Sequence, residues 1–162
     1  MFDKFGEFDS AQELNMAAEG LMKEGDENSL MELAVENGLD KEDAEDYFDG
    51  IVEELATVKM AALGKIKIER NELKPVDIME DWVGYIETCI GESEEMAVAV
   101  RRKGKSLKAC IAELLKWSFK NQHPVDNDIL KEAGVNQKVT LGIPGMGRAK
   151  KIIREYYLGE KK

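Results

Sequence analysis

The chain has 162 residues, of which 43% are hydrophobic and 35% are charged, and its net charge is −10. This composition suits one globular domain with a real core and a strongly solvated surface. It excludes a membrane span, because no apolar run approaches the roughly 18 residues that a span needs. The N-terminus shows no basic segment followed by an apolar one, so no export signal is expected. Because Cys89 and Cys110 fall on the apolar sides of predicted helices, we expect a cytoplasmic protein with buried, reduced thiols.

The charges are divided unevenly along the chain. Residues 1–54 hold 3 basic and 18 acidic side chains, residues 55–99 hold 5 and 9, and residues 100–162 hold 15 and 6. We therefore predict an acidic N-terminal helical region over 1–54, called the acidic arm, and a helical core domain over 55–162 with a basic C-terminal half. Opposite fields of this kind either meet charged partners or face each other within the fold.

Three short helices are predicted in the acidic arm from capping residues, apolar positions at helical spacing and closing glycines. They run from Ser10 to near Gly25, from Ser29 to Gly38, and from Lys41 to Phe48 behind the cap Asp40. Helices of this length are stable only when they pack together or onto the rest of the chain.

The core domain is also predicted to be helical, so the fold class is all-α: a compact helical domain with an acidic helical N-terminal arm. After one or two helical pieces over 51–73, helices are expected over Val76–Ile90, from Ser93 to Gly104, over Ser106–Lys120, from Asn127 or Asp126 to Gly134 and over Arg148–Leu158, with one strand candidate at Val139–Leu141. The clearest of these, Ser106–Lys120, has an apolar stripe at i, i+3, i+4, i+7 and i+8. We expect it to form the centre of the fold with the last helix, through Leu107, Ile111, Leu114, Ile152, Ile153 and Tyr156.

The sequence lacks the residues that catalysis needs. Its only histidine, His123, precedes Pro124 in a polar turn, where a solvated side chain is expected and not a catalytic base. Two cysteines and one histidine cannot supply the usual structural zinc site, and the acidic run 40–49 fails the EF-hand pattern. The loop Gly142–Gly147 lacks the Lys and the Ser/Thr of a phosphate-binding P-loop. We therefore predict a protein that is not an enzyme, holds no metal and needs no cofactor.

A run of cations at the junction between two predicted helices is the first candidate binding surface. It comprises Arg101, Arg102, Lys103, Lys105 and Lys108. Along the following helix, Lys108, Ala112, Lys116 and Lys120 lie on one i+4 ridge opposite the apolar stripe, which would let a polyanion come close. A solvated face that binds nothing is the alternative.

The glycine-rich loop is the second candidate. Gly142-Ile143-Pro144-Gly145-Met146-Gly147 looks like the hairpin of helix-hairpin-helix proteins, in which Gly145 and Gly147 would expose backbone N–H groups to a phosphate. The segment before it, residues 135–141, is not a convincing first helix. Cations in the first turn of the next helix oppose the helix dipole, which points to a nearby anion. These cations are Arg148, Lys150 and Lys151, with Arg154 one turn later. We expect both basic clusters to form one anion-facing surface.

The acidic arm is the third candidate. Its carboxylates recur on the exposed faces of the three short helices, notably at Asp40, Asp43, Asp46 and Asp49. Such a surface either mimics the phosphates of nucleic acid and occupies a basic channel, or only keeps the protein soluble.

A short stretch resembles a known family. At Lys103-Gly104-Lys105-Ser106-Leu107-Lys108-Ala109-Cys110, with the apolar helix that follows and the turn Pro124-Val125-Asp126, the chain resembles the PcfK-like family. The resemblance covers residues 93–134. It implies a protein of bacterial conjugative elements or phages, and some members of the family are anti-CRISPR inhibitors of the type II RNA-guided nuclease. It implies no catalytic residues.

Two functions follow as hypotheses. The first is a non-enzymatic inhibitor from a mobile element that binds a CRISPR effector nuclease or its guide complex, with the acidic arm competing in the positively charged nucleic-acid channel. The second is a nucleic-acid-binding accessory factor for conjugation or replication, which would use the basic half and the glycine-rich loop.

Overall fold

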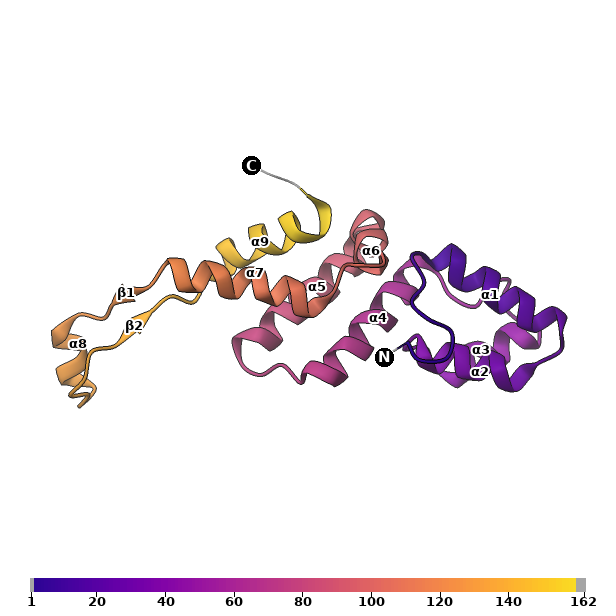
Figure 1. The fold of residues 1–162 in the computed structure, drawn as a ribbon, viewed down its shortest axis with the longest axis horizontal. Coiled ribbons are helices and arrows are strands. Elements are labelled where there is room, and N and C mark those ends of the chain that lie inside the picture. The colour runs from indigo at the N-terminus through magenta and orange to yellow at the C-terminus, as the bar shows by residue number, and fades with distance from the viewer. Residues whose placement is uncertain (1, 160–162) are drawn as a thin grey trace.

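The computed structural model describes residues 2–159 and confirms the all-α prediction (Figure 1). The helices are α1 (Ala11–Lys23), α2 (Glu27–Glu36), α3 (Lys41–Phe48), α4 (Val58–Leu73), α5 (Ile78–Glu92), α6 (Glu94–Arg101), α7 (Leu107–Lys120), α8 (Asn127–Glu132) and α9 (Met146–Leu158). Two short strands, β1 (His123–Pro124) and β2 (Thr140–Leu141), pair in antiparallel fashion. Within the described residues, no helix has the length and apolar character needed to cross a bilayer.

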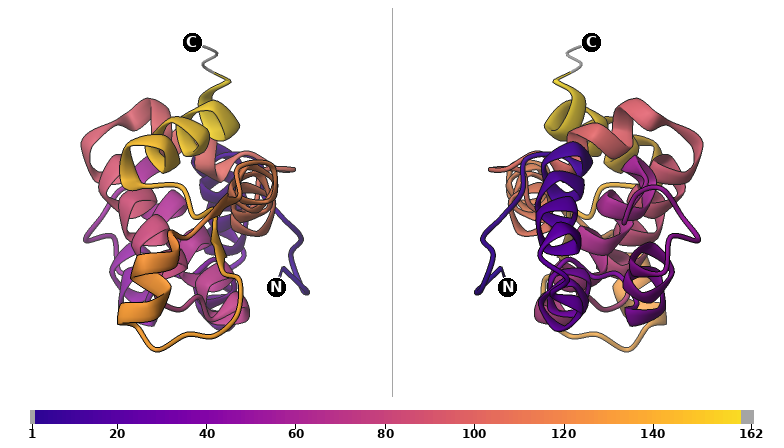
Figure 2. Two further views of the ribbon diagram at one scale, coloured as in Figure 1. Left: turned by 90° about the vertical axis from the view of Figure 1, so that its left-hand side faces the viewer. Right: turned by 90° about the vertical axis from the view of Figure 1, so that its right-hand side faces the viewer.

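The molecule is elongated (Figure 1). The helices of the acidic arm, α1 to α3, lie at one end, and α4, α5, α6, α7 and α9 form the middle. Residues 121–145, which contain β1, α8 and β2 and are called the hairpin extension here, project from the other end. Figure 2 views the molecule from its two ends: the hairpin extension is in front in the left view, and the acidic arm is in front in the right view.

Serine caps open three helices where they were predicted. Ser10, Ser93 and Ser106 each accept a hydrogen bond from the backbone N–H three residues ahead, at 3.1 to 3.2 Å. The predicted cap Ser29 is wrong: α2 begins one turn earlier at Glu27, because the Asp26 carboxylate accepts from the Ser29 N–H at 3.1 Å.

Other boundaries shift for similar local reasons. Residues 51–57 are not helical, and α4 begins as a single helix at Val58, because Thr57 caps it by accepting from the Met60 N–H at 3.1 Å. The strand candidate at 139–141 is confirmed at Thr140–Leu141, and its partner at His123–Pro124 was not predicted. The helix α9 begins at Met146, two residues before the expected start, with Gly145 as its N-cap.

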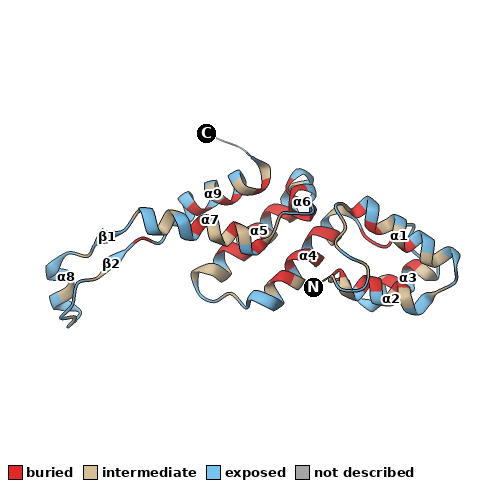
Figure 3. Cartoon of the chain, in the orientation of Figure 1, coloured by how far each residue is buried: buried red, intermediate tan, exposed pale blue. Residues whose placement is uncertain are grey.

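The buried apolar residues form two clusters, both visible as red ribbon in Figure 3. The larger one contains all six predicted central residues: Leu107, Leu114 and Ile153 are fully buried, and Ile111, Ile152 and Tyr156 pack against them. However, the expectation that α7 and α9 form the centre is wrong. Helix α4 packs against α1, α5, α6 and α7, and it places Ala61 in the smaller cluster and Ala62 in the larger one. It therefore joins the acidic arm to the core domain.

A glycine crossing brings the end of α2 onto α4. A Cβ atom added at Gly64 would lie 2.2 Å from the carbonyl oxygen of Asn37, and one added at Gly38 would lie 2.1 Å from the carbonyl oxygen of Gly64. Gly38 also adopts a φ of +74°, which favours glycine. The backbones of the two segments touch here, so neither position has room for a side chain.

Replacing Gly64 by Ala should lower the free energy of unfolding by about 1–3 kcal/mol or more, because the added methyl group meets backbone atoms that cannot rotate away. Gly84→Ala is the matched control: Gly84 lies inside α5 with open space around its Cα, so the variant should gain about 0.5–1 kcal/mol. Urea unfolding of both variants measures the difference. Equal stability of the two variants would contradict the tight crossing.

Candidate interaction surfaces

The first basic cluster is not one exposed surface. Arg101, predicted to be part of an exposed binding surface, is only 1% exposed, so that prediction is wrong. It occupies the last turn of α6, where its Nη2 donates to the Oδ1 of Asn37 at 2.8 Å. The guanidinium also lies over the ring of Phe2, 5.3 Å from the ring centre. Burial lowers the pKa of Arg101, while Glu7 and Glu69 oppose that shift. This cation therefore belongs to the contact between the acidic arm and the core domain.

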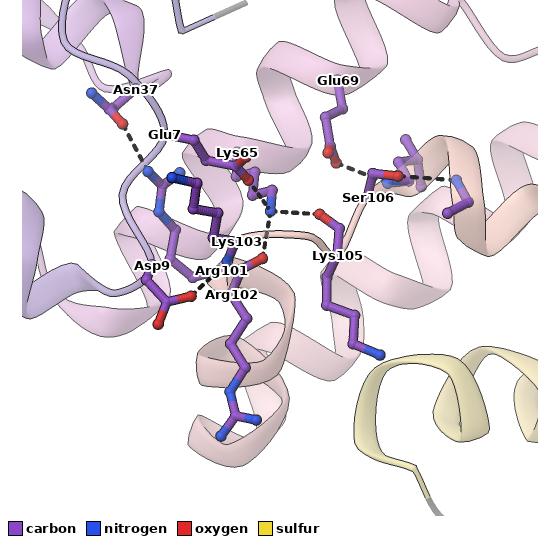
Figure 4. Close-up of polar contacts among 12 residues, drawn as sticks. Glu7, Asp9, Asn37, Lys65, Glu69, Arg101, Arg102, Lys103, Lys105 and Ser106 are labelled. Carbon is purple, nitrogen blue, oxygen red and sulfur yellow. Dashed lines mark hydrogen bonds and ion pairs between the residues drawn. The ribbon is translucent and has the colours of Figure 1, made fainter.

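A buried lysine completes the same contact (Figure 4). The Nζ of Lys65 on α4 donates to the carbonyl oxygens of Arg102 and Lys105, at 2.9 and 2.7 Å, and forms an ion pair with Glu7 at 2.9 Å. These three acceptors match the three N–H donors of an ammonium group. Lys65 thus ties the turn between α6 and α7 to α4 and to the N-terminal segment.

The remaining members of this cluster have mixed roles. The side chains of Arg102, Lys103 and Lys108 are exposed, as predicted. The backbone N–H of Lys103 donates to Asp9 at 2.8 Å. Lys105 is half-buried, and its Nζ donates to the carbonyl oxygen of Tyr156 at 2.6 Å. Most of the polar groups in this turn therefore bind the chain itself.

Two buried titratable groups lie beside the network. The Glu69 carboxylate accepts from the Leu107 N–H through Oε2 at 3.1 Å, and within the described residues its buried Oε1 has no hydrogen-bond partner. Burial raises the pKa of Glu69 to about 7, against the opposing effect of Lys65. Burial likewise raises the pKa of Cys110 to about 12, and both cysteines are free and buried, as predicted.

Replacing Glu69 by Gln should change how stability depends on pH. Since the pKa of Glu69 rises from 4.5 to about 7 on folding, the folded state binds more protons than the unfolded state in that window, and stability falls as the pH rises through it. We therefore expect the stability of Glu69→Gln, relative to wild type, to increase between pH 5 and pH 8, by at most about 1.4 kcal/mol per pH unit. Urea unfolding measures it, with the exposed Glu45→Gln as control. A pH-independent difference would contradict the assignment.

The acidic arm presents most of its carboxylates to solvent. Of the 18 acidic residues in 1–54, 14 are exposed and the other 4 are half-buried. The four predicted aspartates divide into two kinds. Asp40 caps α3, and its carboxylate forms an ion pair with Lys67 at 3.3 Å. The Asp40 backbone N–H donates to the Asp43 carboxylate, so Asp40 and Asp43 together shape the start of the helix. Asp46 and Asp49 are exposed on the later turns.

The glycine-rich loop does not form a helix-hairpin-helix motif. The segment before it carries the strand β2, so the first helix of that motif is missing. Gly145 and Gly147 are exposed at the start of α9, followed by exposed Arg148 and Lys151. Lys150 lies over the ring of Tyr85 at 5.2 Å. Burial raises the pKa of that same tyrosine and the neighbouring Arg154 opposes the rise, so both cations lie close to α5.

The two basic clusters lie at opposite ends of α9. Lys105 and Ser106 bond to Tyr156 near the end of this helix, whereas Arg148 to Lys151 occupy its beginning. The expected single anion-facing surface is therefore not formed. The exposed Lys116 and Lys120 belong with the second group, since they lie in the last turns of α7, next to the hairpin extension.

The structure adds a surface that the sequence analysis missed. In segments 114–125 and 139–151, which form the base of the hairpin extension, the chain has five lysines and arginines and no carboxylate. The same base exposes large apolar side chains: Leu115 at 54%, Phe119 at 75%, Leu141 and Ile143 at 60% each, and Met146 at 36%. The sequence analysis places Leu115 in the apolar stripe of α7 at i+8, and that prediction is wrong, because its side chain is exposed. Phe119, one turn later, continues the same exposed row.

Comparison with known proteins gives no relative: no family model, no curated protein and no solved structure matches the chain.

Proposed function

We propose that the chain is a non-enzymatic binding protein that inhibits a type II RNA-guided nuclease, and that the acidic arm makes the contact. The observation that carries this proposal is the separation of charge. The 14 exposed carboxylates of the arm lie on its three helices and on the caps and segments that flank them. The arm has its own apolar cluster and lies at the end of the molecule opposite the cationic base of the hairpin extension.

Such a nuclease holds its heteroduplex in a positively charged channel that recognises backbone geometry and not sequence. A rigid scaffold that displays closely spaced carboxylates competes for such a channel, because its charges are already ordered and lose little entropy on binding. The residue pattern at 103–110, which resembles the PcfK-like family, supports the same class of partner.

The proposal is tested by DNA cleavage with a purified, guide-loaded type II nuclease and increasing amounts of the chain. Neutralising four exposed carboxylates of α3 and its end (Glu42→Gln, Glu45→Gln, Asp46→Asn and Asp49→Asn) spares the helix caps Asp40 and Asp43. This variant should inhibit at least about tenfold more weakly, equivalent to about 1.4 kcal/mol. The control variant Arg148→Gln, Lys150→Gln, Lys151→Gln should inhibit like wild type. Unimpaired inhibition by the α3 variant would refute the proposed contact, and a wild-type chain without inhibition would refute the function.

A nucleic-acid-binding accessory factor for conjugation or replication is the second candidate. The carboxylate-free base of the hairpin extension favours it, because cations near an exposed aromatic ring suit single-stranded nucleic acid. A gel shift on random single-stranded and duplex DNA at two salt concentrations separates the candidates, since strong salt-sensitive binding is expected only for the accessory factor.

A further inference from the structure

The acidic arm contains a hollow of about 560 Å³ between α1 and the segment that leads into α4. Glu19, Glu53 and Glu54 lie around it, and none of the described residues that line it is a lysine or an arginine. Its apolar part includes Met16, which is 66% exposed. Ile51, at 69% exposure, precedes the two lining glutamates in the chain. The hollow thus combines negative charge with the exposed apolar side chain of Met16, and Ile51 lies outside its lining.

The base of the hairpin extension is its complement. It carries Lys116, Lys120, Arg148, Lys150 and Lys151 around the exposed Leu115, Phe119, Leu141 and Ile143. Lys116 forms an ion pair with Glu113 on the same helix at 2.7 Å. Both side chains are exposed, so the pair is screened by solvent and the surface keeps its positive potential.

The extension gains little from the rest of its own chain. In residues 121–141, all of which the structure describes, no residue is buried. Its order depends on the β1–β2 pairing and on two further hydrogen bonds. The Val125 N–H donates to the Val139 carbonyl oxygen at 2.9 Å, and the Thr140 hydroxyl donates to the Gln122 side-chain oxygen at 2.9 Å. A two-stranded hairpin by itself is only marginally stable in water, and exposed apolar patches mark interaction sites.

We propose that a second copy of this chain covers both surfaces: the base of the hairpin extension of each copy seats on the acidic hollow of the other. A contact between two such bases would place five cations against five, which Coulomb repulsion disfavours. A contact from extension to hollow pairs opposite charges and apolar side chains at once. The two surfaces lie at opposite ends of an elongated molecule. The proposed assembly is the closed one, an antiparallel dimer with two-fold symmetry in which both contacts form at once.

Nucleic acid is the less favoured occupant. It would use the cations and Phe119, but it would leave Leu115, Leu141 and Ile143 without an apolar partner, and it would leave the acidic hollow unexplained. The proposal is independent of nuclease inhibition, since it concerns the chain by itself.

The mass of the full chain in solution tests the dimer. In sedimentation velocity at about 0.1 M salt, where the Debye length is about 10 Å, we expect twice the monomer mass. At about 1 M salt the Debye length falls to about 3 Å, and we expect a shift towards the monomer. Lys116→Glu with Lys120→Glu, and separately Glu53→Lys with Glu54→Lys, should each give monomers. An equal mixture of the two variants should restore the dimer, because each contact then pairs opposite charges again.

Two matched controls change charge elsewhere: Arg102→Glu with Lys103→Glu, and Glu42→Lys with Glu45→Lys. Both should remain dimers, and circular dichroism should show native helix content in all four variants. A wild-type monomer at every concentration, or failure of the mixture to dimerise, overturns the proposal. A monomer that shifts random single-stranded DNA, and loses this with Lys116→Glu and Lys120→Glu, overturns it in favour of nucleic acid.

Discussion

The packing of the acidic arm against the core domain depends on the contacts of one buried cation, the guanidinium of Arg101. Burying a charge costs several kcal/mol unless other groups compensate for its lost hydration. Here Asn37 from the end of α2, Phe2 from the N-terminal segment and the nearby Glu7 and Glu69 supply part of that compensation. Among the described residues, the buried Nε and Nη1 of Arg101 have no hydrogen-bond partner. Since the compensating groups come from both the acidic arm and α4, the charge is compensated only when the two parts are docked.

The glycine crossing lies next to this charge and positions one of its partners. Gly64 allows the end of α2 to touch α4, and that approach places Asn37 within hydrogen-bond distance of Arg101. Asn37 is itself buried and donates to the Leu33 carbonyl at 2.9 Å, so its amide is held in one orientation. A docked arm keeps the acidic surface at one end of the molecule and the cationic base of the extension at the other.

The sequence predicts most of the helices, because their caps and apolar spacing are local features. Ser10, Ser93 and Ser106 identify their helix starts correctly for this reason. It does not predict that Arg101 is buried, because a run of cations looks alike whether one member points inward or outward. A partial signal exists at Lys65 and Glu69, which are one turn apart on the face of α4 that also carries Ala61, Ala62 and Ile66. Charges inside an apolar stripe indicate a buried network, but only the tertiary fold identifies their partners. The base of the hairpin extension escaped prediction because it combines segments about 20 residues apart in the chain.

Differential scanning calorimetry of Arg101→Ala tests most directly whether the two buried apolar clusters unfold together. The wild-type chain should unfold in one transition, because the docked charge links both apolar clusters. Arg101→Ala leaves the buried Oδ1 of Asn37 without its donor and removes the cation near Glu7 and Glu69, so we expect a loss of about 1–3 kcal/mol and an earlier, separate transition for the acidic arm. The exposed Arg102→Ala serves as the control and should keep the wild-type profile. A single transition at the wild-type midpoint in Arg101→Ala would contradict the central role of this buried charge.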